Sequence, residues 1–192
     1  MIRWHWTTYA AVAAVVMAGL AALPDRTIAA RQAPAPAAPT LSLSSDLQGA
    51  GSTAVISLTL RAPDGVTVGK AVSEVSFPTK FLTFHNVTRG LSAEAVGGEV
   101  IVEPQPAKGD QSVLRVIVTA KAGETLPAGS LAELRFRILK EAKVDAKLVL
   151  ANAASAWADA AATTAIDPVI GVNGEVKVTK TTLLPACFFY MH

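Results

Sequence analysis

The stretch GSLAELRFRI, from Gly129 to Ile138, alternates apolar and polar side chains from Ala132 onward. One set is apolar, Ala132, Leu134, Phe136 and Ile138, and the other is charged, Glu133, Arg135 and Arg137. Successive side chains of a β-strand point to opposite faces, so this period of two predicts a strand with one buried face. The charged set should then face the solvent.

The same period recurs through most of the chain. The segments that share it are 40–44, 54–60, 74–77, 99–103, 112–120 and 175–178. Turn-forming residues separate them, among them Pro63-Asp64-Gly65, Gly97-Gly98, Lys108-Gly109-Asp110 and Asn173-Gly174. Short strands divided by turns, without alternating amphipathic helices, predict an all-β sandwich of two antiparallel sheets packed face to face.

One alanine-rich stretch fits this pattern less well. Residues 151–165, ANAASAWADAAATTA, have the composition of a helix but no clear apolar stripe, and Thr163-Thr164 disfavours a helix. We predict a strand from Lys147 to Ala153 and a loop after it, with a short helix as the alternative.

The first thirty residues have the layout of a secretory signal peptide. Arg3 supplies the positive start, the 15 residues from Tyr9 to Leu23 carry no charge, and Pro24-Asp25 ends the run. We predict cleavage after Ala30, with cleavage after Ala21 as an alternative. An uncleaved membrane anchor is the other alternative, although the run is shorter than the roughly 20 apolar residues of a spanning helix. The chain is therefore expected to be exported, to the extracellular space, the periplasm or the cell surface.

The rest of the chain divides into a linker, a domain and a tail. Residues 31–39, RQAPAPAAP, alternate Ala and Pro, a composition that favours an extended spacer. The predicted sandwich occupies residues 40–180. Residues 181–192, TTLLPACFFYMH, are apolar and too short to span a membrane. We expect a poorly ordered tail there, with a cover over a strand edge or a partner contact as alternatives, and a mature protein that does not span a membrane.

The composition argues against nucleic-acid binding and against catalysis. Net charge is +2 without a basic cluster, which argues against nucleic-acid binding. The single cysteine allows no disulfide within the chain and no cysteine metal cluster, and His85 is the only histidine away from the chain ends. The sequence contains no G-x-S-x-G element and no EF-hand loop. We expect no enzymatic activity, no metal and no cofactor.

Four stretches resemble the cohesin family. Residues 75–87, VSFPTKFLTFHNV, resemble its aliphatic–aromatic strand, turn and following strand, although Phe77-Pro78 stands where that turn usually has Asp-Pro. Residues 129–138 resemble the cohesin strand G-x-L-A-x-L-x-F-x-V, and segments 148–153 and 173–178 resemble the last two strands. The resemblance covers residues 40–180 and implies a nine-stranded jelly-roll sandwich that binds dockerin modules through one sheet face. Calcium in that pair belongs to the dockerin, so no metal is implied for this chain.

The function that the resemblance implies is that of a secreted, non-catalytic module for attachment to a protein partner. That partner would be a dockerin-type module or another extracellular or envelope protein, with a link to polysaccharide degradation. Two alternatives remain open, a direct carbohydrate-binding module and a structural component of a bacterial envelope or secretion assembly. Aromatic content opposes the first, because Trp157 is the only tryptophan beyond the signal peptide and Tyr190 lies in the tail.

Strand phase, combined with the resemblance, predicts the partner surface. The binding sheet would comprise strands near 71–77, 98–103, 112–119 and 147–153. The side chains on its outward face should be Val72, Glu74, Ser76, Glu99, Ile101, Arg115, Ile117 and Thr119. Apolar residues surrounded by polar ones are typical of a protein-binding patch, and Arg115 is the candidate anchor. The alternative is that scattered apolar residues on a sheet face carry no function.

Overall fold

The computed structural model describes residues 38–180, which hold twelve β-strands and one short helix. The strands are β1 Thr40–Leu43, β2 Ser45–Gly49, β3 Thr53–Arg61, β4 Lys70–Pro78, β5 Leu82–Arg89, β6 Glu99–Lys108, β7 Gln111–Thr119, β8 Gly129–Ile138, β9 Lys147–Trp157, β10 Ala165–Ile166, β11 Ile170–Val172 and β12 Gly174–Thr179. The predicted signal peptide, most of the linker and the predicted tail lie outside the described residues.

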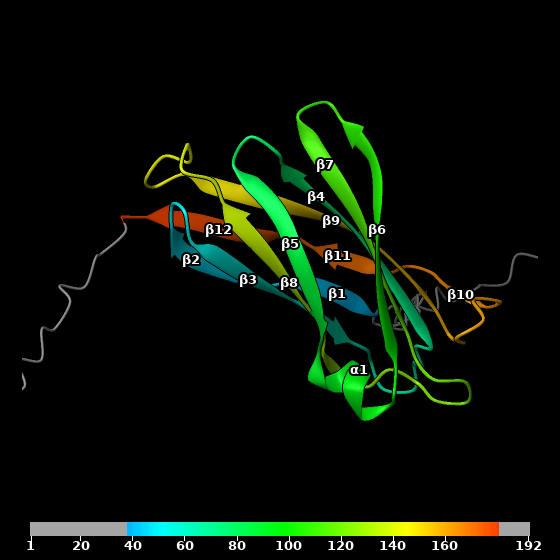
Figure 1. Ribbon diagram of the computed structural model, residues 1–192. Helices are drawn as coiled ribbons and strands as arrows, with labels where there is room; N and C mark the ends of the chain where they lie inside the picture. Colours follow the sequence, from blue (N-terminus) through cyan, green and yellow to red (C-terminus); the bar gives the residue numbers. More distant parts are fainter. Residues whose placement is uncertain (1–37, 181–192) are drawn as a thin grey trace, which may run out of the picture. The chain divides into compact units, whose positions relative to one another are not determined.

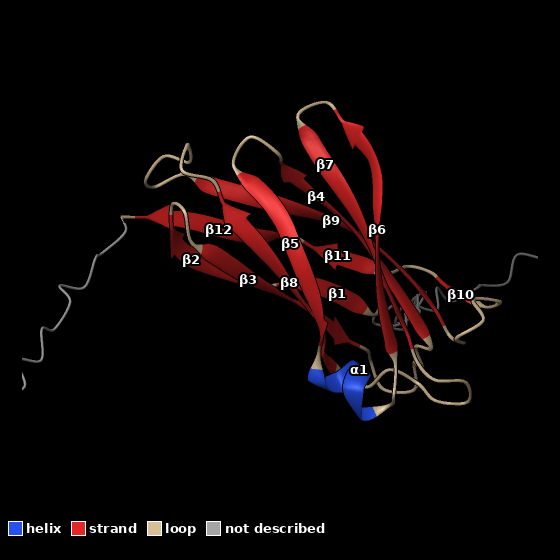
Figure 2. Ribbon diagram, viewed as in Figure 1, coloured by secondary structure: helices blue, strands red, loops and turns tan. Residues whose placement is uncertain are grey.

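The strands form two sheets that pack face to face (Figure 1). One sheet has the order β11-β1-β3-β8-β5, and the other has the order β2-β12-β9-β4-β7-β6, with β10 paired to β9. Strands dominate the described part of the chain, and the helix α1, Leu91–Ala95, lies at one end of the sandwich (Figure 2). The expected all-β class is confirmed.

The prediction of two purely antiparallel sheets was wrong, because each sheet contains one parallel pair. β1 pairs in parallel with β11, and β2 pairs in parallel with β12. The first strand region passes from one sheet to the other at Ser44, and the last does the same at Asn173. Each end of the chain therefore contributes to both sheets, and residues 38–180 contain more strand segments than the nine expected.

The core lies between the two sheets and is filled by the apolar sets of the alternating strands. Leu134, Phe136 and Ile138 of β8 are fully buried, as the opening stretch predicts. The ring of Phe136 contacts Phe77 edge-on, with centroids 5.0 Å apart, and Phe84 in the same way at 5.7 Å. Such edge-to-face pairs add about 0.5–1.5 kcal/mol beyond the burial of apolar area.

Strand β9 continues to Trp157, four residues beyond its predicted end at Ala153. Its second half pairs with β4, and the alternative of a short helix there is wrong. Strand β11 crosses close to this strand and leaves no room for a side chain at Gly171, because a Cβ there would collide with the Asn152 carbonyl oxygen and lie 3.3 Å from the Ala154 Cβ. Tertiary packing therefore overrides the low strand propensity of alanine.

A buried polar link joins the two sheets. The Ser73 hydroxyl of β4 donates to the Asn152 side-chain oxygen of β9 over 2.6 Å. The Asn152 amide nitrogen donates to the Leu41 carbonyl of β1 over 2.8 Å. The Asn152 backbone N–H donates to the Asn173 side-chain oxygen over 2.9 Å. The link satisfies polar groups that would otherwise destabilise the core.

Helix α1 connects β5 to β6, and no sequence pattern predicted it. It is five residues long and buries Ala93. Among residues 38–180 no helix has the length and apolar character that crossing a membrane requires.

Candidate partner-binding face

The outward side of strands β9, β4, β7 and β6 forms one continuous surface, which we call the partner face. Cross-strand pairing places its residues in four rows. In the order β9, β4, β7, β6 the rows are Ala151, Ser76, Val113, Gln105; Ala153, Glu74, Arg115, Glu103; Ser155, Val72, Ile117, Ile101; and Trp157, Lys70, Thr119, Glu99. Directly paired side chains lie on the same side of a sheet, about 5 Å apart.

The strands bring all eight predicted residues together on this face. Glu99 and Ile101 are exposed, and five others are half-buried: Glu74, Ser76, Arg115, Ile117 and Thr119. Val72 is the exception, because it is only 2% exposed. It occupies an inner strand between Ile117 and Ser155 in its row, so the prediction that it is exposed was wrong.

Arg115 lies between two carboxylates of its row, Glu74 and Glu103. Its Nε is buried and has no hydrogen-bond partner among the described residues. This Nε lies below the surface, so a ligand would contact only the outer part of the half-buried Arg115 side chain. The guanidinium is thus positioned to take part in binding.

The sequence reasoning missed Trp157 and Lys70, which complete one edge of the partner face. The Lys70 ammonium lies 5.7 Å from the centroid of the half-buried Trp157 ring, a cation–π contact. Tryptophan and arginine are enriched among the residues that dominate protein-interface energies. Continuing the alternation of β9 from Ala153 through Ser155 to Trp157 would have placed the ring on this face.

Small and apolar side chains extend the partner face towards β12 and β2. Ala151 and Ala153 are exposed, and Val149 of β9 is 50% exposed. Leu47 of β2 is 60% exposed and pairs with Lys177 of β12. With Ile101, at 42% exposure on the opposite edge, these residues form a broken apolar strip across the sheet.

The turn that follows β9 is held by the Asp159 carboxylate. It accepts hydrogen bonds from the Thr163 backbone N–H at 3.0 Å, the Thr164 backbone N–H at 2.8 Å and the Thr163 hydroxyl at 2.9 Å. The first of these is the main reason that the pKa of Asp159 lies below its ordinary value of 3.8. This carboxylate therefore stabilises the turn itself.

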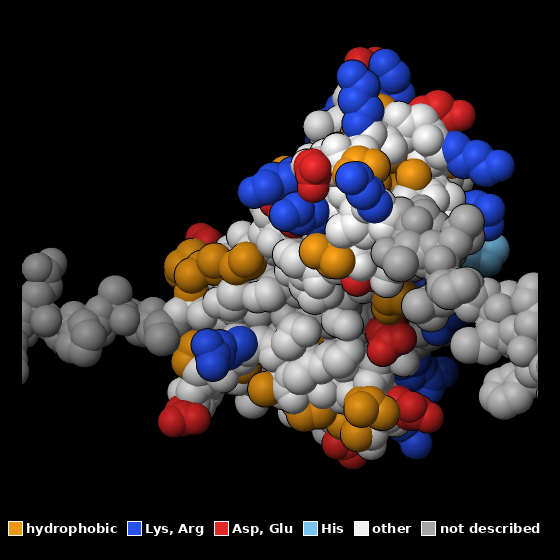
Figure 3. Space-filling view, turned by 90° about the vertical axis from the view of Figure 1, so that its left-hand side faces the viewer, with side chains coloured by type: hydrophobic (Ala, Val, Ile, Leu, Met, Phe, Trp, Pro, Cys, Tyr) orange, Lys and Arg blue, Asp and Glu red, His pale blue; other side chains and the backbone are white. Residues whose placement is uncertain are grey.

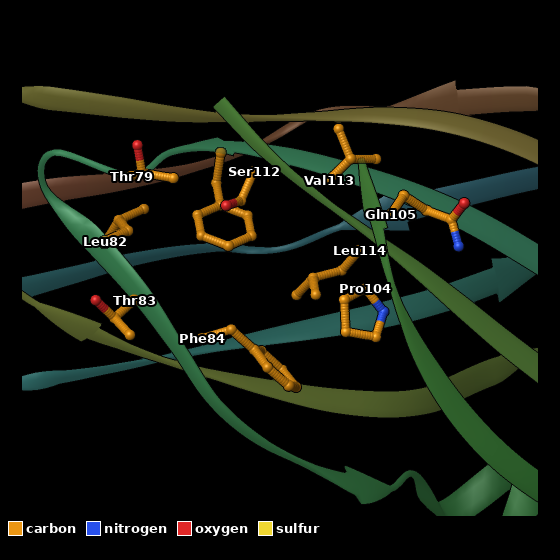
Figure 4. A pocket seen from close by; sticks show the side chains of 10 residues that line it. Thr79, Leu82, Thr83, Phe84, Pro104, Gln105, Ser112, Val113 and Leu114 are labelled. Atoms are coloured by element: carbon orange, nitrogen blue, oxygen red, sulfur yellow. The ribbon is translucent and has the colours of Figure 1, made fainter. Parts of the chain in front are cut away.

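A cavity of about 280 Å³ opens between the edge strands β5 and β6. Figure 4 shows Phe84 of β5, with Pro104 of β6 and Leu114 of β7, around the same space. Its lining contains no ionisable side chain. The cavity therefore contains no side chain that could act as a general acid or base beside its hydroxyl groups.

The rest of the described surface offers no cluster of metal-binding side chains. Residues 38–180 contain no group of three or more His, Cys, Asp and Glu side chains that could hold a metal ion. His85 is exposed at a β-bulge of β5, between Phe84 and Asn86. The end of the sandwich where β12 finishes shows acidic and basic side chains interspersed with hydrophobic ones (Figure 3).

Comparison with known proteins gives matches in structure only. No protein-family model matches the chain, and no curated protein matches it. The third cohesin of ScaC in complex with the ScaB dockerin, from Acetivibrio cellulolyticus, aligns with a TM-score of 0.61 and 16% identity, over 73% of this chain and 99% of that one. A non-cellulosomal cohesin from the archaeon Archaeoglobus fulgidus aligns with a TM-score of 0.55 and 18% identity, over 76% of this chain and 94% of that one.

A third similar structure is the seventh ScaB type I cohesin of Pseudobacteroides cellulosolvens. It aligns with a TM-score of 0.57 and 14% identity, over 77% of this chain and 96% of that one. The chain thus has a cohesin-like fold, as the sequence resemblance implies.

Proposed function

We propose that this chain is a non-catalytic, exported binding module that attaches a protein partner of dockerin type through the partner face. The fold supports this proposal, since similar structures include a cohesin in complex with a dockerin. The cohesin resemblance assigns binding to one sheet face, and the strands it selects carry the four rows described above. An envelope protein is the second partner class.

The composition of the partner face carries the proposal. Ile101 and Ile117 occupy one row, with the Arg115 row on one side and the Trp157 row on the other. An apolar centre with a polar rim is the usual composition of a protein interface. The half-buried Arg115 side chain adds a cation that a carboxylate of the partner would complement.

Direct binding of neutral polysaccharide is less well supported as the main function. Trp157 is the only tryptophan in the described residues, and it lies at a corner of the partner face. Phe77 and Phe136 are core residues, and Phe84 packs against them. A link to polysaccharide degradation would come through the partner, and a structural role in an envelope or secretion assembly is the remaining alternative.

The test is capture of partners from the secreted proteins of the same cells. The wild-type protein should retain a specific partner, and the Ile101→Asp, Arg115→Ala double variant should lose it. Val55→Asp, on the outward side of the other sheet, is the matched control and should retain it. Equal capture by the double variant, with unchanged circular dichroism, would exclude the partner face. A dockerin sequence in the captured protein distinguishes the dockerin class from an envelope protein.

Export and domain limits form a separate part of the proposal. The signal peptide would end at Ala30, and residues 31–39 would form an extended spacer before the sandwich. The sandwich would occupy residues 40–180, and residues 181–192 would form a tail. Mass spectrometry of the exported protein should find an N-terminus at Arg31. Retention of Met1 would instead establish the uncleaved anchor.

A further inference from the structure

The outward side of the five-stranded sheet differs in character from the partner face. Strand β8 lies between β3 and β5 (Figure 1), and its outward side chains are Glu133, Arg135 and Arg137. The flanking outward side chains are mostly short and polar: Thr53, Val55, Ser57, Thr59 and Arg61 on β3, and Thr83, Asn86 and Thr88 on β5. We call this surface the arginine face.

Cross-strand pairing gives each β8 arginine at least one neighbour that can form hydrogen bonds. Arg137 is exposed and lies between Thr53 and Thr83. Arg135 lies between Val55 and Asn86. The two arginines are two positions apart on one strand, so their Cα atoms are about 6.6 Å apart. They form a short cationic ladder bordered by hydroxyl and amide groups.

The positive charge of the arginine face is only partly offset by the described residues. The Nε of Arg135 is buried without a hydrogen-bond partner. Glu133, the one carboxylate of this face, accepts a long hydrogen bond from the Thr88 hydroxyl, at 3.5 Å. With three arginines and one glutamate the arginine face has a net charge of +2, whereas the partner face has three glutamates, one lysine and one arginine.

We propose that the arginine face binds an acidic polysaccharide whose uronic-acid carboxylates pair with Arg135 and Arg137. A planar guanidinium matches a carboxylate through two parallel hydrogen bonds. The threonine, serine and asparagine side chains beside the ladder are suited to the hydroxyl groups of a sugar chain. A flat sheet gives an extended polymer room to lie across the strands.

Charge and composition favour this occupant over others. Val55, at 38% exposure, is the one exposed large apolar side chain of the arginine face, so the apolar centre of a protein interface is missing there. No aromatic side chain belongs to the face as defined, so it has no platform for stacking nucleic-acid bases or neutral sugar rings. Binding would depend on charge and would weaken with salt.

Because the two faces are on opposite sheets, both can be occupied at once. The module would then hold a protein partner on one side and an acidic polymer on the other. This second function is independent of the proposed partner binding, and either can fail without the other.

The test is affinity electrophoresis of the exported protein in gels that contain polygalacturonate, with neutral dextran as the reference gel. The wild-type protein should be retarded by polygalacturonate alone, and 0.5 M NaCl should abolish the retardation. Arg135→Gln, Arg137→Gln should raise the dissociation constant at least tenfold. Arg115→Gln, Lys70→Gln removes the same charge from the opposite face and should retain wild-type retardation.

Further variants and reference gels identify the class of ligand. Arg135→Lys, Arg137→Lys keeps the charge but loses the paired hydrogen bonds, and should weaken binding about threefold or more. If the Arg115→Gln, Lys70→Gln variant lost as much retardation by polygalacturonate, the binding would depend on net charge alone, and the proposal would be overturned. Absence of retardation, retardation by dextran sulfate or DNA alone, or equal retardation by neutral dextran would also overturn it. Thermal unfolding checks that each variant is folded.

Discussion

The two outward faces of the sandwich are both built from β-strands, but their side chains differ in polarity and in net charge. On the partner face, Ile101, Ile117 and Trp157 interrupt the charged residues, and carboxylates outnumber cations. On the arginine face, Arg137 lies between two threonines, and Arg135 lies between Val55 and Asn86. Inside, both sheets present the same kind of aliphatic and aromatic residues. The difference shows that the core determines the fold, whereas the outward positions are free to specify what each face binds.

Loss of the buried polar link should damage both faces together. Asn152→Ala leaves the Leu41 carbonyl and the Ser73 hydroxyl without their partner. Because each buried polar group left unsatisfied destabilises by about 1–3 kcal/mol, we expect a loss of about 3 kcal/mol. Urea unfolding measures it, with Ser155→Ala on the outward side of β9 as the control. A loss below 1 kcal/mol would show that the link does not hold the sheets together.

Trp157→Ala should weaken binding at the partner face and leave binding at the arginine face unchanged. Truncation of an aromatic residue that dominates an interface weakens binding by about 2 kcal/mol, or roughly 30-fold in the dissociation constant, and we expect this effect although Trp157 lies at a corner of the partner face. Isothermal titration calorimetry with the captured partner measures the change. Retardation by polygalacturonate should be unaffected, and a parallel loss of both activities would mean that the variant is misfolded.

Val72→Ala should distinguish a supporting residue from a contact residue on the partner face. Val72 is buried, so its truncation should lower the free energy of unfolding by about 1–2 kcal/mol and barely change partner affinity. Ile117→Ala, beside it in the same row, should do the reverse. A large affinity loss in Val72→Ala at unchanged stability would contradict this assignment.

The smallest expected effect is on the stability of the fold at acidic pH. Hydrogen bonds from Thr163 and Thr164 lower the pKa of Asp159 in the folded chain. The ionised carboxylate therefore stabilises the folded state above the unfolded-state pKa, and this contribution is lost as pH falls through the folded-state pKa. The shift of the urea midpoint between pH 7 and pH 3 should be smaller in Asp159→Asn than in the wild type. An identical shift would mean that the turn is not coupled to folding.

Sequence alone predicted the interior better than the surfaces. The alternation around Phe136 is a local signal, and it identified a strand and its buried side correctly. The burial of Val72 depends on Ile117 and Ser155 from two other strands, and their register is not a local property. Partner-face residues could be grouped because the cohesin resemblance supplied the strand neighbours.

The alanine-rich end of β9 and the crossings between sheets escaped prediction for physical reasons. Alanine has little strand propensity, and the pairing with β4 that makes this segment a strand is not a local property of the sequence. The crossings at Ser44 and Asn173 follow no period, because each inserts one residue between two short strands. The arginine face went unnoticed because its members come from separate strands and none is exceptional by itself.

The parallel pairing of the first and last strands has a mechanical consequence. The described chain enters at the start of β1 and leaves at the end of β12, at opposite ends of the sandwich (Figure 1). A pull on the two ends would slide β1 along β11 and β2 along β12, which have three and five registered residue pairs. In this shear geometry the hydrogen bonds of each pair share the load and must break together, whereas peeling breaks them one by one. A module that tethers one object to another would gain resistance to tension, and single-molecule stretching from the chain ends should need more force than stretching across the β6–β7 hairpin.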